Sequence, residues 1–378
     1  MRILIVGGGV AGLTLAALLR QRGMRPAIIE RSRNYNQAGY VLGLWPLGSR
    51  VLHGLGLHDQ FLSVSQPMFT YNVCNGHGEV LHSYSFADFD QRYGTSRGLM
   101  RSELLDILLH GLRDLPIRMG TSLVSVEQDE HQVRVATTDG KQDAYDLVVG
   151  CDGIHSQVRQ LVFGEHPLHR TGWAGYAFWV EPEAAPHDAI TEIWGAGRFF
   201  GIYPTTSRLC VFNGMPIPTG HREPAEGRVA RMREAFGMLG GAAPRILAAV
   251  AEDDEVFYTE YADIRMPTWH EGRVVLLGDA GSALLPTAGV GASMAMESAA
   301  VLADELSRAD ARTIPHALAL FEKRRHGRVD KVQADSRTLA KMMFIESTPL
   351  SFGRDVLMKF YSQEQFVKSF VKIYDEPI

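Results

Sequence analysis

The chain has 378 residues, of which 46% are hydrophobic and 21% charged, and these values predict a globular protein of two or three domains with a large core. The formal net charge of −5, without a basic block, argues against nucleic acid as a partner, and no apolar run reaches the roughly 18 residues that a membrane-spanning helix needs. Three widely separated cysteines and the lack of a signal-peptide pattern argue against a disulfide framework or a cysteine metal site and favour a cytoplasmic location.

The first predicted element is a short apolar strand that runs into a glycine-rich turn and then into an apolar helix. Gly7 allows the tight turn, Gly9 lets a phosphate approach the backbone, and Gly12 permits close packing of helix on strand. With the free N–H groups of the helix N-terminus, this unit predicts a site for a dinucleotide pyrophosphate. Glu30 ends the second strand, at the distance expected of an acid that binds ribose hydroxyls, and Arg31 next to it is included in the predicted site.

Several elements follow the opening unit. An apolar helix is expected at 46–57, and a strand pair at about 66–93 is interpreted as a hairpin inserted into the nucleotide-binding domain. A leucine stripe at 102–115 predicts a helix that begins at a Ser102 cap. The alternating pattern at 124–149 predicts a hairpin and then a buried strand.

Between residues 172 and 263 the chain consists of strand-like runs rich in aromatic residues, interrupted by one helix at 225–239. This pattern predicts a mostly antiparallel sheet with one face available to a flat apolar ligand. The candidate substrate residues on this sheet are Tyr176, Trp194, Tyr203 and Phe212. Aromatic residues on a sheet are more often core, so core packing is the alternative for each of them.

Two more turns follow buried strands later in the chain. Asp152 and Gly153 end the strand that begins near residue 146, and Gly278 and Asp279 end the strand at 272–277. Past the second turn, a glycine-rich loop leads into another helix, whose N-terminus can bind an anion or a carbonyl oxygen.

These three turns, in this order and spacing, resemble the single-component (group A) flavoprotein monooxygenases, the family of p-hydroxybenzoate hydroxylase-like aromatic hydroxylases. The resemblance runs from residue 1 to about 340. It implies an α/β fold with a Rossmann-like FAD-binding domain of the glutathione-reductase type, an inserted, mostly antiparallel substrate domain and C-terminal helices. The implied boundaries are 1–171 for the first part of the FAD-binding domain, 172–263 for the substrate domain, 264–340 for the return segment and 341–378 for the C-terminal helical segment.

The resemblance also implies roles for individual residues. The glycine turn and Glu30 would hold the FAD pyrophosphate and ribose, the Asp-Gly turn would meet both FAD and NAD(P)H, and the Gly-Asp turn would bind the ribityl chain. The implied cofactor residues are Gly7, Gly9, Gly12, Glu30, Arg31, Arg101, Asp152, Gly153, Gly278, Asp279, Pro286, Gly291 and Ala292. Pro286 is also a substrate candidate, because its loop would lie against the isoalloxazine ring. The backbone N–H groups of Gly289, Gly291 and Ala292 are the candidates for stabilising negative charge on the flavin during the reaction.

The implied reaction is a hydroxylation that needs neither a catalytic triad nor a metal. NAD(P)H would reduce FAD, O2 would add to give a flavin hydroperoxide, and its distal oxygen would pass to an aromatic or polycyclic small molecule. NAD(P)H would dock only transiently, because the sequence contains no separate nicotinamide-binding unit. The expected protein is a monomer or homodimer without integral membrane association.

The chain departs from the family pattern at five positions. Gly281 and Ser282 replace an Ala-His pair, Val290 a glutamine, Ser293 an asparagine and Ser298 an aspartate. Backbone and glycines carry most of the flavin cradle, so we expect it to survive, while substrate orientation and flavin mobility stay open. The alternatives are a flavin-dependent halogenase or reductase on the same scaffold, or a flavin-binding redox module without turnover. The lack of a Trp-x-Trp-x-Ile-Pro segment counts against a halogenase.

Overall fold

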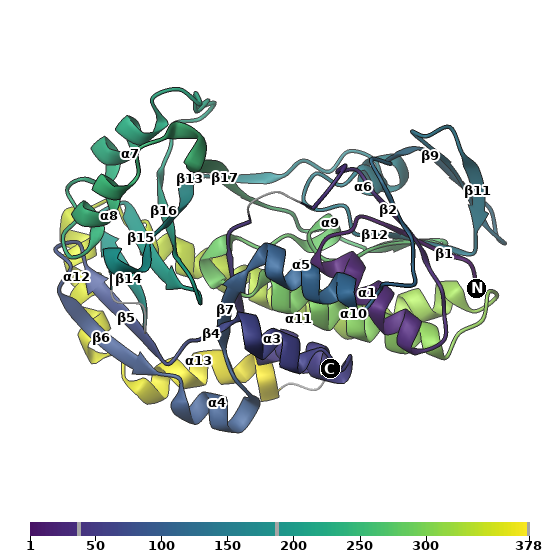
Figure 1. Cartoon of the computed structure of the whole chain (residues 1–378), viewed down its shortest axis with the longest axis horizontal. Helices are drawn as coiled ribbons and strands as arrows, with labels where there is room; N and C mark the ends of the chain where they lie inside the picture. The colour runs from purple at the N-terminus through teal and green to yellow at the C-terminus, as the bar shows by residue number, and fades with distance from the viewer. Residues whose placement is uncertain (36–38, 186–188, 376–378) are drawn as a thin grey trace.

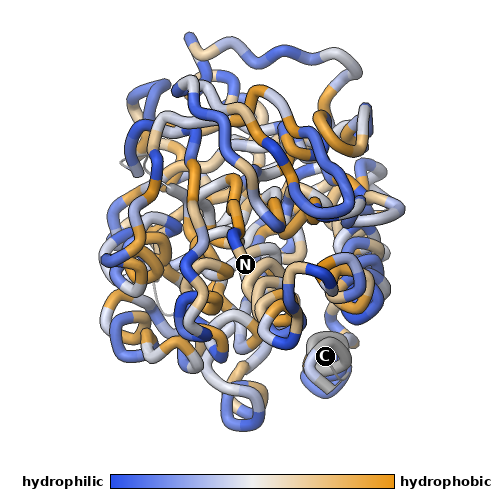
Figure 2. The backbone as a smooth tube through the Cα atoms, turned by 90° about the vertical axis from the view of Figure 1, so that its right-hand side faces the viewer, coloured by the Kyte–Doolittle hydropathy of each residue, from blue (hydrophilic) through white to orange (hydrophobic). Residues whose placement is uncertain are grey.

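The computed structural model describes residues 1–35, 39–185 and 189–375. Two large sheets lie toward opposite ends of its long axis, and long helices run alongside one of them (Figure 1). Many hydrophobic residues lie toward the middle of the molecule, whereas several of the outer loops are hydrophilic (Figure 2). Within the described ranges, no helix is both long and apolar enough to cross a membrane.

The first large sheet has six strands in the order β18-β19-β12-β1-β2-β8. Its inner strand β1 (Ile3–Val6) is buried throughout and runs parallel to both of its neighbours. Because both faces of this part of the sheet are covered, the strand is a continuous apolar run. The glycine turn connects β1 to α1 (Val10–Gln21), which packs against α10 (Gly291–Ser307). The other strands are β2 (Ala27–Glu30), β8 (Ile117–Met119), β12 (Leu147–Gly150), β18 (His270–Glu271) and β19 (Val274–Leu276).

The second large sheet has seven strands in the order β17-β13-β16-β15-β14-β5-β6. All of its pairings are antiparallel except that of β5 with β14. One face packs under α7 (Arg228–Phe236) and α8 (Ala243–Ala249) around a separate apolar core, and the other face joins the main core. The strands are β5 (Thr70–Asn75), β6 (Val80–Ser85), β13 (His169–Val180), β14 (Ala189–Gly195), β15 (Arg198–Pro204), β16 (Leu209–Pro216) and β17 (Phe257–Asp263).

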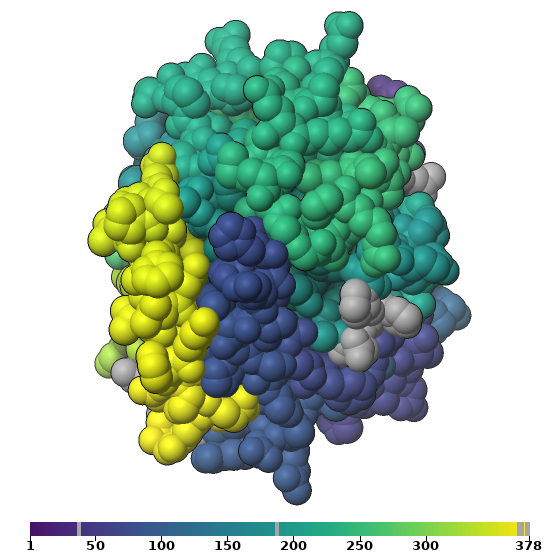
Figure 3. Space-filling view, turned by 90° about the vertical axis from the view of Figure 1, so that its left-hand side faces the viewer, coloured from purple at the N-terminus to yellow at the C-terminus, as the bar shows by residue number. Residues whose placement is uncertain are grey.

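The remaining elements connect and cover these sheets. Two small antiparallel sheets contain β9 (Leu123–Gln128), β10 (Val133–Thr137) and β11 (Gln142–Tyr145), and β3 (Val41–Leu44), β4 (Gln66–Pro67) and β7 (Arg97–Met100). The other helices are α2 (Pro46–Gly54), α3 (His58–Val64), α4 (Ala87–Tyr93), α5 (Arg101–His110), α6 (Gln157–Phe163), α9 (Asp279–Ser282), α11 (Ile314–Met343), α12 (Thr348–Phe360) and α13 (Gln363–Asp375). The C-terminal helices lie beside the β5–β6 hairpin on the surface (Figure 3).

The expected α/β architecture is confirmed, and three local expectations differ from the structure. The helix expected at 225–239 spans only α7, which ends at Phe236 before Gly237, and a second short helix, α8, follows the glycines at 240 and 241. The leucine-rich helix begins at Arg101 rather than at Ser102, with Met100 as its N-cap. The hairpin near 66–93 extends the seven-stranded sheet, since β5 pairs with β14 and not with a strand of the nucleotide-binding unit.

Candidate cofactor and substrate site

The glycine turn after β1 is shaped by close backbone contacts. Gly7 has φ +110, and a Cβ there would lie 2.3 Å from the carbonyl oxygen of Cys151. A Cβ on Gly12 would lie 2.0 Å from the Gly7 oxygen, so only glycine fits at either position. A Cβ on Gly9 would meet only the Arg101 guanidinium, at 4.0 Å. The turn is therefore packed tightly behind and open in front, as a pyrophosphate site requires.

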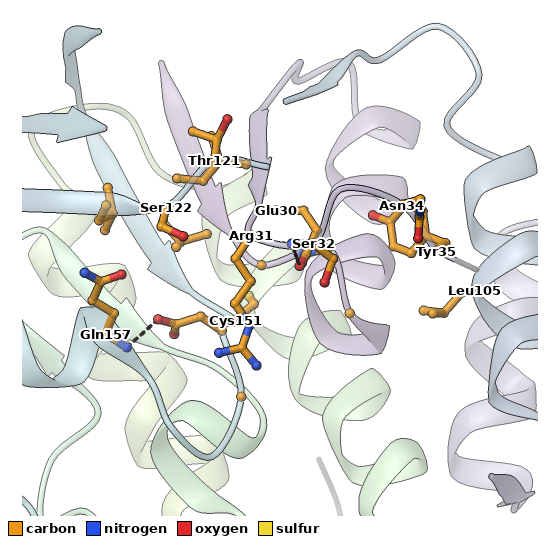
Figure 4. A pocket seen from close by; sticks show the side chains of 18 of the residues that line it. Glu30, Arg31, Ser32, Asn34, Tyr35, Leu105, Thr121, Ser122, Cys151 and Gln157 are labelled. Atoms are coloured by element: carbon orange, nitrogen blue, oxygen red, sulfur yellow. Dashed lines mark hydrogen bonds between the residues drawn. The ribbon is translucent and has the colours of Figure 1, made fainter. Parts of the chain in front are cut away.

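Glu30 is held against this turn by backbone hydrogen bonds. Its Oε2 accepts from the N–H of Gly8 at 2.7 Å, and its Oε1 accepts from the N–H of Ser32 at 2.8 Å (Figure 4). A carboxylate oxygen can accept two hydrogen bonds, so each oxygen keeps a lone pair for a ligand hydroxyl. Tyr35 lies beside the same turn, and burial, together with the charge of Glu30, raises the pKa of its phenol to about 12.

A cleft extends in front of these groups. Seven of the predicted cofactor residues line it, namely Gly7, Gly9, Glu30, Arg31, Arg101, Asp152 and Gly153, and Gly12 packs behind the turn. In Figure 4, Glu30, Arg31, Ser32, Asn34 and Tyr35 lie on one side of the cleft, and Thr121, Ser122 and Gln157 lie across from them. Gly278, Asp279, Pro286 and the 289–292 loop are not among the residues that line this part of the site.

The Asp-Gly turn is fixed by its own side chain. Asp152 accepts hydrogen bonds from the Ser156 hydroxyl at 2.6 Å and from the N–H groups of Gln157 and Val158 at 2.7 and 3.0 Å. These bonds cap the N-terminus of α6. Arg159, buried on the same helix, donates to the carbonyl oxygen of Ala280 at 2.7 Å. Arg159 thereby ties the Asp-Gly turn to the Gly-Asp turn, which its sequence position alone did not reveal.

Arg101 joins the first turn to the Gly-Asp turn. It lies at the start of α5 beside Gly9, and its positive charge also acts on the Asp279 carboxyl. Desolvation raises the pKa of the Asp279 carboxyl, and the charge of Arg101 partly opposes that shift. Desolvation and the charge of Asp279 likewise raise the pKa of Tyr40. Gly278 has φ +64 and packs on α1, where a Cβ would lie 3.0 Å from that of Ala11. Both glycine motifs therefore meet around α1 and Arg101.

The loop before α10 is held by Trp45. The Trp45 indole N–H donates to the Gly289 carbonyl oxygen at 2.9 Å, and the Trp45 backbone N–H donates to the Ser293 hydroxyl at 3.1 Å. Gly289 has φ +60, and its own N–H donates to Pro286 within the loop, so that group is engaged in this conformation. Gly291 and Ala292 lie in the first turn of α10, where N–H groups have no partner within the helix.

The four candidate substrate residues divide between the two faces of the seven-stranded sheet. Trp194, Tyr203 and Phe212 belong to the face that joins the main core, and the Phe212 ring lies 5.9 Å from Tyr40. Tyr176 lies on the opposite face, in the core beneath α7, where its hydroxyl bonds to Glu223 at 3.2 Å. Side chains alternate between faces along a strand, and an aromatic run does not reveal which face meets the ligand.

Sequence reasoning did not single out Glu192, although an acid inside the run Ala-Ile-Thr-Glu-Ile-Trp of β14 is a visible signal. Its buried carboxylate accepts hydrogen bonds from Tyr71, Tyr203 and Trp194. Two of these donors are candidate substrate residues. Buried polar groups among aromatic side chains are a frequent feature of binding sites.

The departures from the family pattern also have partners in the structure. Ser298 accepts a hydrogen bond from the Arg325 Nε at 3.2 Å, beside the buried pairs that Glu297 forms with Arg325 and Arg328. The hydroxyl of Ser282 donates to the Gly278 carbonyl oxygen at 3.2 Å. Ser293 binds the Trp45 backbone, and Val290 is buried at the start of α10.

Comparisons with known proteins match most of the chain. A family model described as an FAD binding domain matches residues 1–336. The 6-hydroxynicotinate 3-monooxygenase of Pseudomonas fluorescens is 30% identical over 371 residues, covering 94% of this chain and 95% of that protein. The FAD-dependent urate hydroxylase of Klebsiella pneumoniae is 29% identical over 343 residues, covering 87% of each. The solved structure of Klebsiella pneumoniae HpxO complexed with FAD and uric acid superposes with a TM-score of 0.91 at 26% identity, covering 100% of this chain and 97% of that one.

Proposed function

The chain belongs to the FAD-binding-domain family and is an FAD-dependent monooxygenase, and we propose that it hydroxylates an aromatic heterocycle with NAD(P)H as electron donor and O2 as co-substrate. The observation that carries this proposal is the position of Arg101. It borders the pyrophosphate turn and Asp279 together, so that one extended cofactor can span both motifs.

The residues present fit FAD. The front of Gly9 is open, and the N-terminus of α1 offers N–H groups and partial positive charge to the pyrophosphate. Glu30 keeps lone pairs for ribose hydroxyls, and Asp279 would bind the ribityl chain. When bound, FAD supplies the electron transfer and the activation of oxygen. We further propose the division into an FAD-binding domain at 1–171 and 264–340, a substrate domain at 172–263 and a C-terminal segment at 341–378.

The chain's own residues position the reactants and exclude water. The N–H groups of Gly291 and Ala292, at the positive end of α10, would stabilise negative charge that develops at the reacting oxygen. Trp45 holds the loop that carries these groups. Phe212 and Tyr203 offer an aromatic surface on the sheet, 5.7 Å apart and edge to face, against which a flat ring can lie.

Two relatives point to the substrate class. One is named for 6-hydroxynicotinate and the other for urate, and both compounds are flat nitrogen heterocycles with hydroxyl or oxo groups on the ring. We propose a substrate of this chemical kind, bound between the Tyr203–Phe212 surface and the 286–292 loop. The proposed enzyme works in the cytoplasm as a monomer or homodimer.

The test uses the purified yellow holoenzyme with NADPH or NADH in air and a panel of hydroxypyridines, quinolones, purines and phenols. We expect one or more compounds to stimulate reductant oxidation and to gain the mass of one oxygen. Reductant oxidation that never depends on any compound of the panel would overturn the proposal. A halogenated product formed in the presence of bromide would support a halogenase instead.

A further inference from the structure

Glu192 lies in the middle of β14 on the sheet face that joins the main core, and its side chain is almost fully buried. Three side chains donate hydrogen bonds to it. Oε2 accepts from the Tyr71 hydroxyl at 2.6 Å and from the Trp194 indole N–H at 3.0 Å, and Oε1 accepts from the Tyr203 hydroxyl at 2.7 Å. Tyr71 and Tyr203 come from the two neighbouring strands, β5 and β15, and Trp194 from Glu192's own strand, so the sheet itself assembles the cluster.

Arranging a carboxylate in this way costs stability. Burial raises the pKa of Glu192, and the three hydrogen bonds oppose the rise. All three donors are neutral, whereas Glu223 on the opposite face of the sheet is paired with Arg231. A buried carboxylate without a cationic partner is expensive, and such groups concentrate at functional sites.

The hydrogen bond to Glu192 fixes what the Tyr203 hydroxyl can do. The Tyr203 hydroxyl donates its single proton to Oε1 at 2.7 Å. Toward a ligand, the Tyr203 oxygen can then only accept a hydrogen bond. Burial and the charge of Glu192 also raise the pKa of Tyr203, so that the phenol stays protonated.

Tyr203 lies at the end of an aromatic path from the cofactor site. The charge of Asp279 acts on the Tyr40 phenol. The centre of the Tyr40 ring lies 5.9 Å from that of Phe212, which in turn lies 5.7 Å from that of Tyr203. A Cβ on Gly201 would lie 2.6 Å from the Tyr203 hydroxyl, so the glycine lets the ring lie against the strand with its oxygen next to Glu192. The hydroxyl is thus held in one place at the side of the proposed substrate position.

We propose that Glu192 is a positioning residue that makes Tyr203 an acceptor, and that the site therefore takes an aromatic ring carrying an N–H or O–H donor. This inference rests on the proposed function, because it places the substrate on the Tyr203–Phe212 surface. A ring whose donor is blocked by a methyl group would leave the Tyr203 lone pairs unsatisfied, and the loss of such a hydrogen bond is a strong basis for discrimination.

The test compares two probes on the holoenzyme, quinolin-4(1H)-one and its N-methyl derivative. Binding is followed by the change in the flavin absorption spectrum. We expect wild-type protein to bind the N–H probe about tenfold more tightly than the N-methyl probe, which corresponds to one good hydrogen bond. Tyr203→Phe should bring the two affinities together. Glu192→Gln should also reduce the ratio, because an amide can donate to Tyr203 and free its proton.

Glu223→Gln and Tyr258→Phe are matched controls, because both residues lie on or beside the opposite face of the same sheet. They should keep the wild-type ratio. The inference would be overturned if wild-type protein bound both probes equally or bound neither. It would also be overturned if Tyr203→Phe kept the wild-type affinity ratio. If Glu192→Gln does not fold, the Tyr203→Phe ratio decides the outcome.

Failure of the proposed function is distinguishable from failure of this inference. Reduction of the bound flavin by NADPH or NADH is measured on the same preparations without any probe. If the flavin is reduced but the probes are not discriminated, only the inference about Glu192 fails.

Discussion

Replacing Trp45 with phenylalanine should loosen the loop that precedes α10. The substitution removes the 2.9 Å hydrogen bond to the Gly289 carbonyl oxygen but keeps an aromatic ring against Phe86 and Phe89. A neutral hydrogen bond contributes about 1 kcal/mol net, and the part-buried acceptor left behind adds about another 1 kcal/mol. About 2 kcal/mol shifts the equilibrium between the loop bound to Trp45 and the loop released from it by roughly 30-fold.

The assay measures how much of the NAD(P)H consumed ends as hydrogen peroxide rather than as hydroxylated product. A loosened loop admits water to the reacting oxygen, so Trp45→Phe should raise the peroxide fraction severalfold while retaining FAD. Ser293→Ala, which removes the acceptor of the Trp45 backbone N–H, should shift it in the same direction. Trp173→Phe, which changes an indole stacked on Phe344, is the control. A wild-type peroxide fraction in Trp45→Phe would refute the role given to this hydrogen bond.

Three further substitutions test the cradle and its support. Gly12→Val should abolish FAD retention through gel filtration, since even a Cβ would lie 2.0 Å from the Gly7 oxygen; full flavin occupancy would contradict the account of the turn. Arg325→Met should lower the free energy of unfolding, measured by denaturant titration, by about 3–5 kcal/mol, because Glu297 then keeps only one of its two buried arginine partners. A change below about 1 kcal/mol would contradict a stabilising role of this cluster. Burial raises the pKa of Asp90 to about 6, so its stabilising contribution is present below its unfolded pKa and lost as the pH rises through 6. Asp90→Asn should therefore raise Tm relative to wild type at pH 7.5 but not at pH 4, and an equal shift at both would show that titration of Asp90 is not the cause.

The parts of the site that could be predicted from sequence are those in which one short segment specifies the geometry. Gly7 and Gly12 are required by contacts within a single strand-turn-helix unit, so their spacing alone is informative. The same holds for Gly278, whose positive φ marks the end of a strand. Such motifs also indicate the succession of strand, turn and helix in the Rossmann-like unit, so the fold class could be predicted from them.

The rest depends on contacts between distant segments. Tyr176 and Tyr203 are both aromatic residues on strands, and only the tertiary packing places the first under α7 and the second beside Glu192. The partner of the 70–85 hairpin was equally hidden, because strand pairing over more than a hundred residues leaves no local pattern. Trp45 and Gly289 are 244 residues apart, and no spacing rule connects an indole to a distant loop carbonyl.

The most direct test of the central claim is the origin of the oxygen atom in the product. The reaction is run with a heterocyclic substrate found in the panel, once under 18O2 in ordinary water and once in H218O under ordinary O2, and product masses are recorded. A monooxygenase places one 18O atom in the product in the first experiment and none in the second. Label that enters from water and not from O2 would contradict the assignment and point to a hydrolytic or hydration reaction.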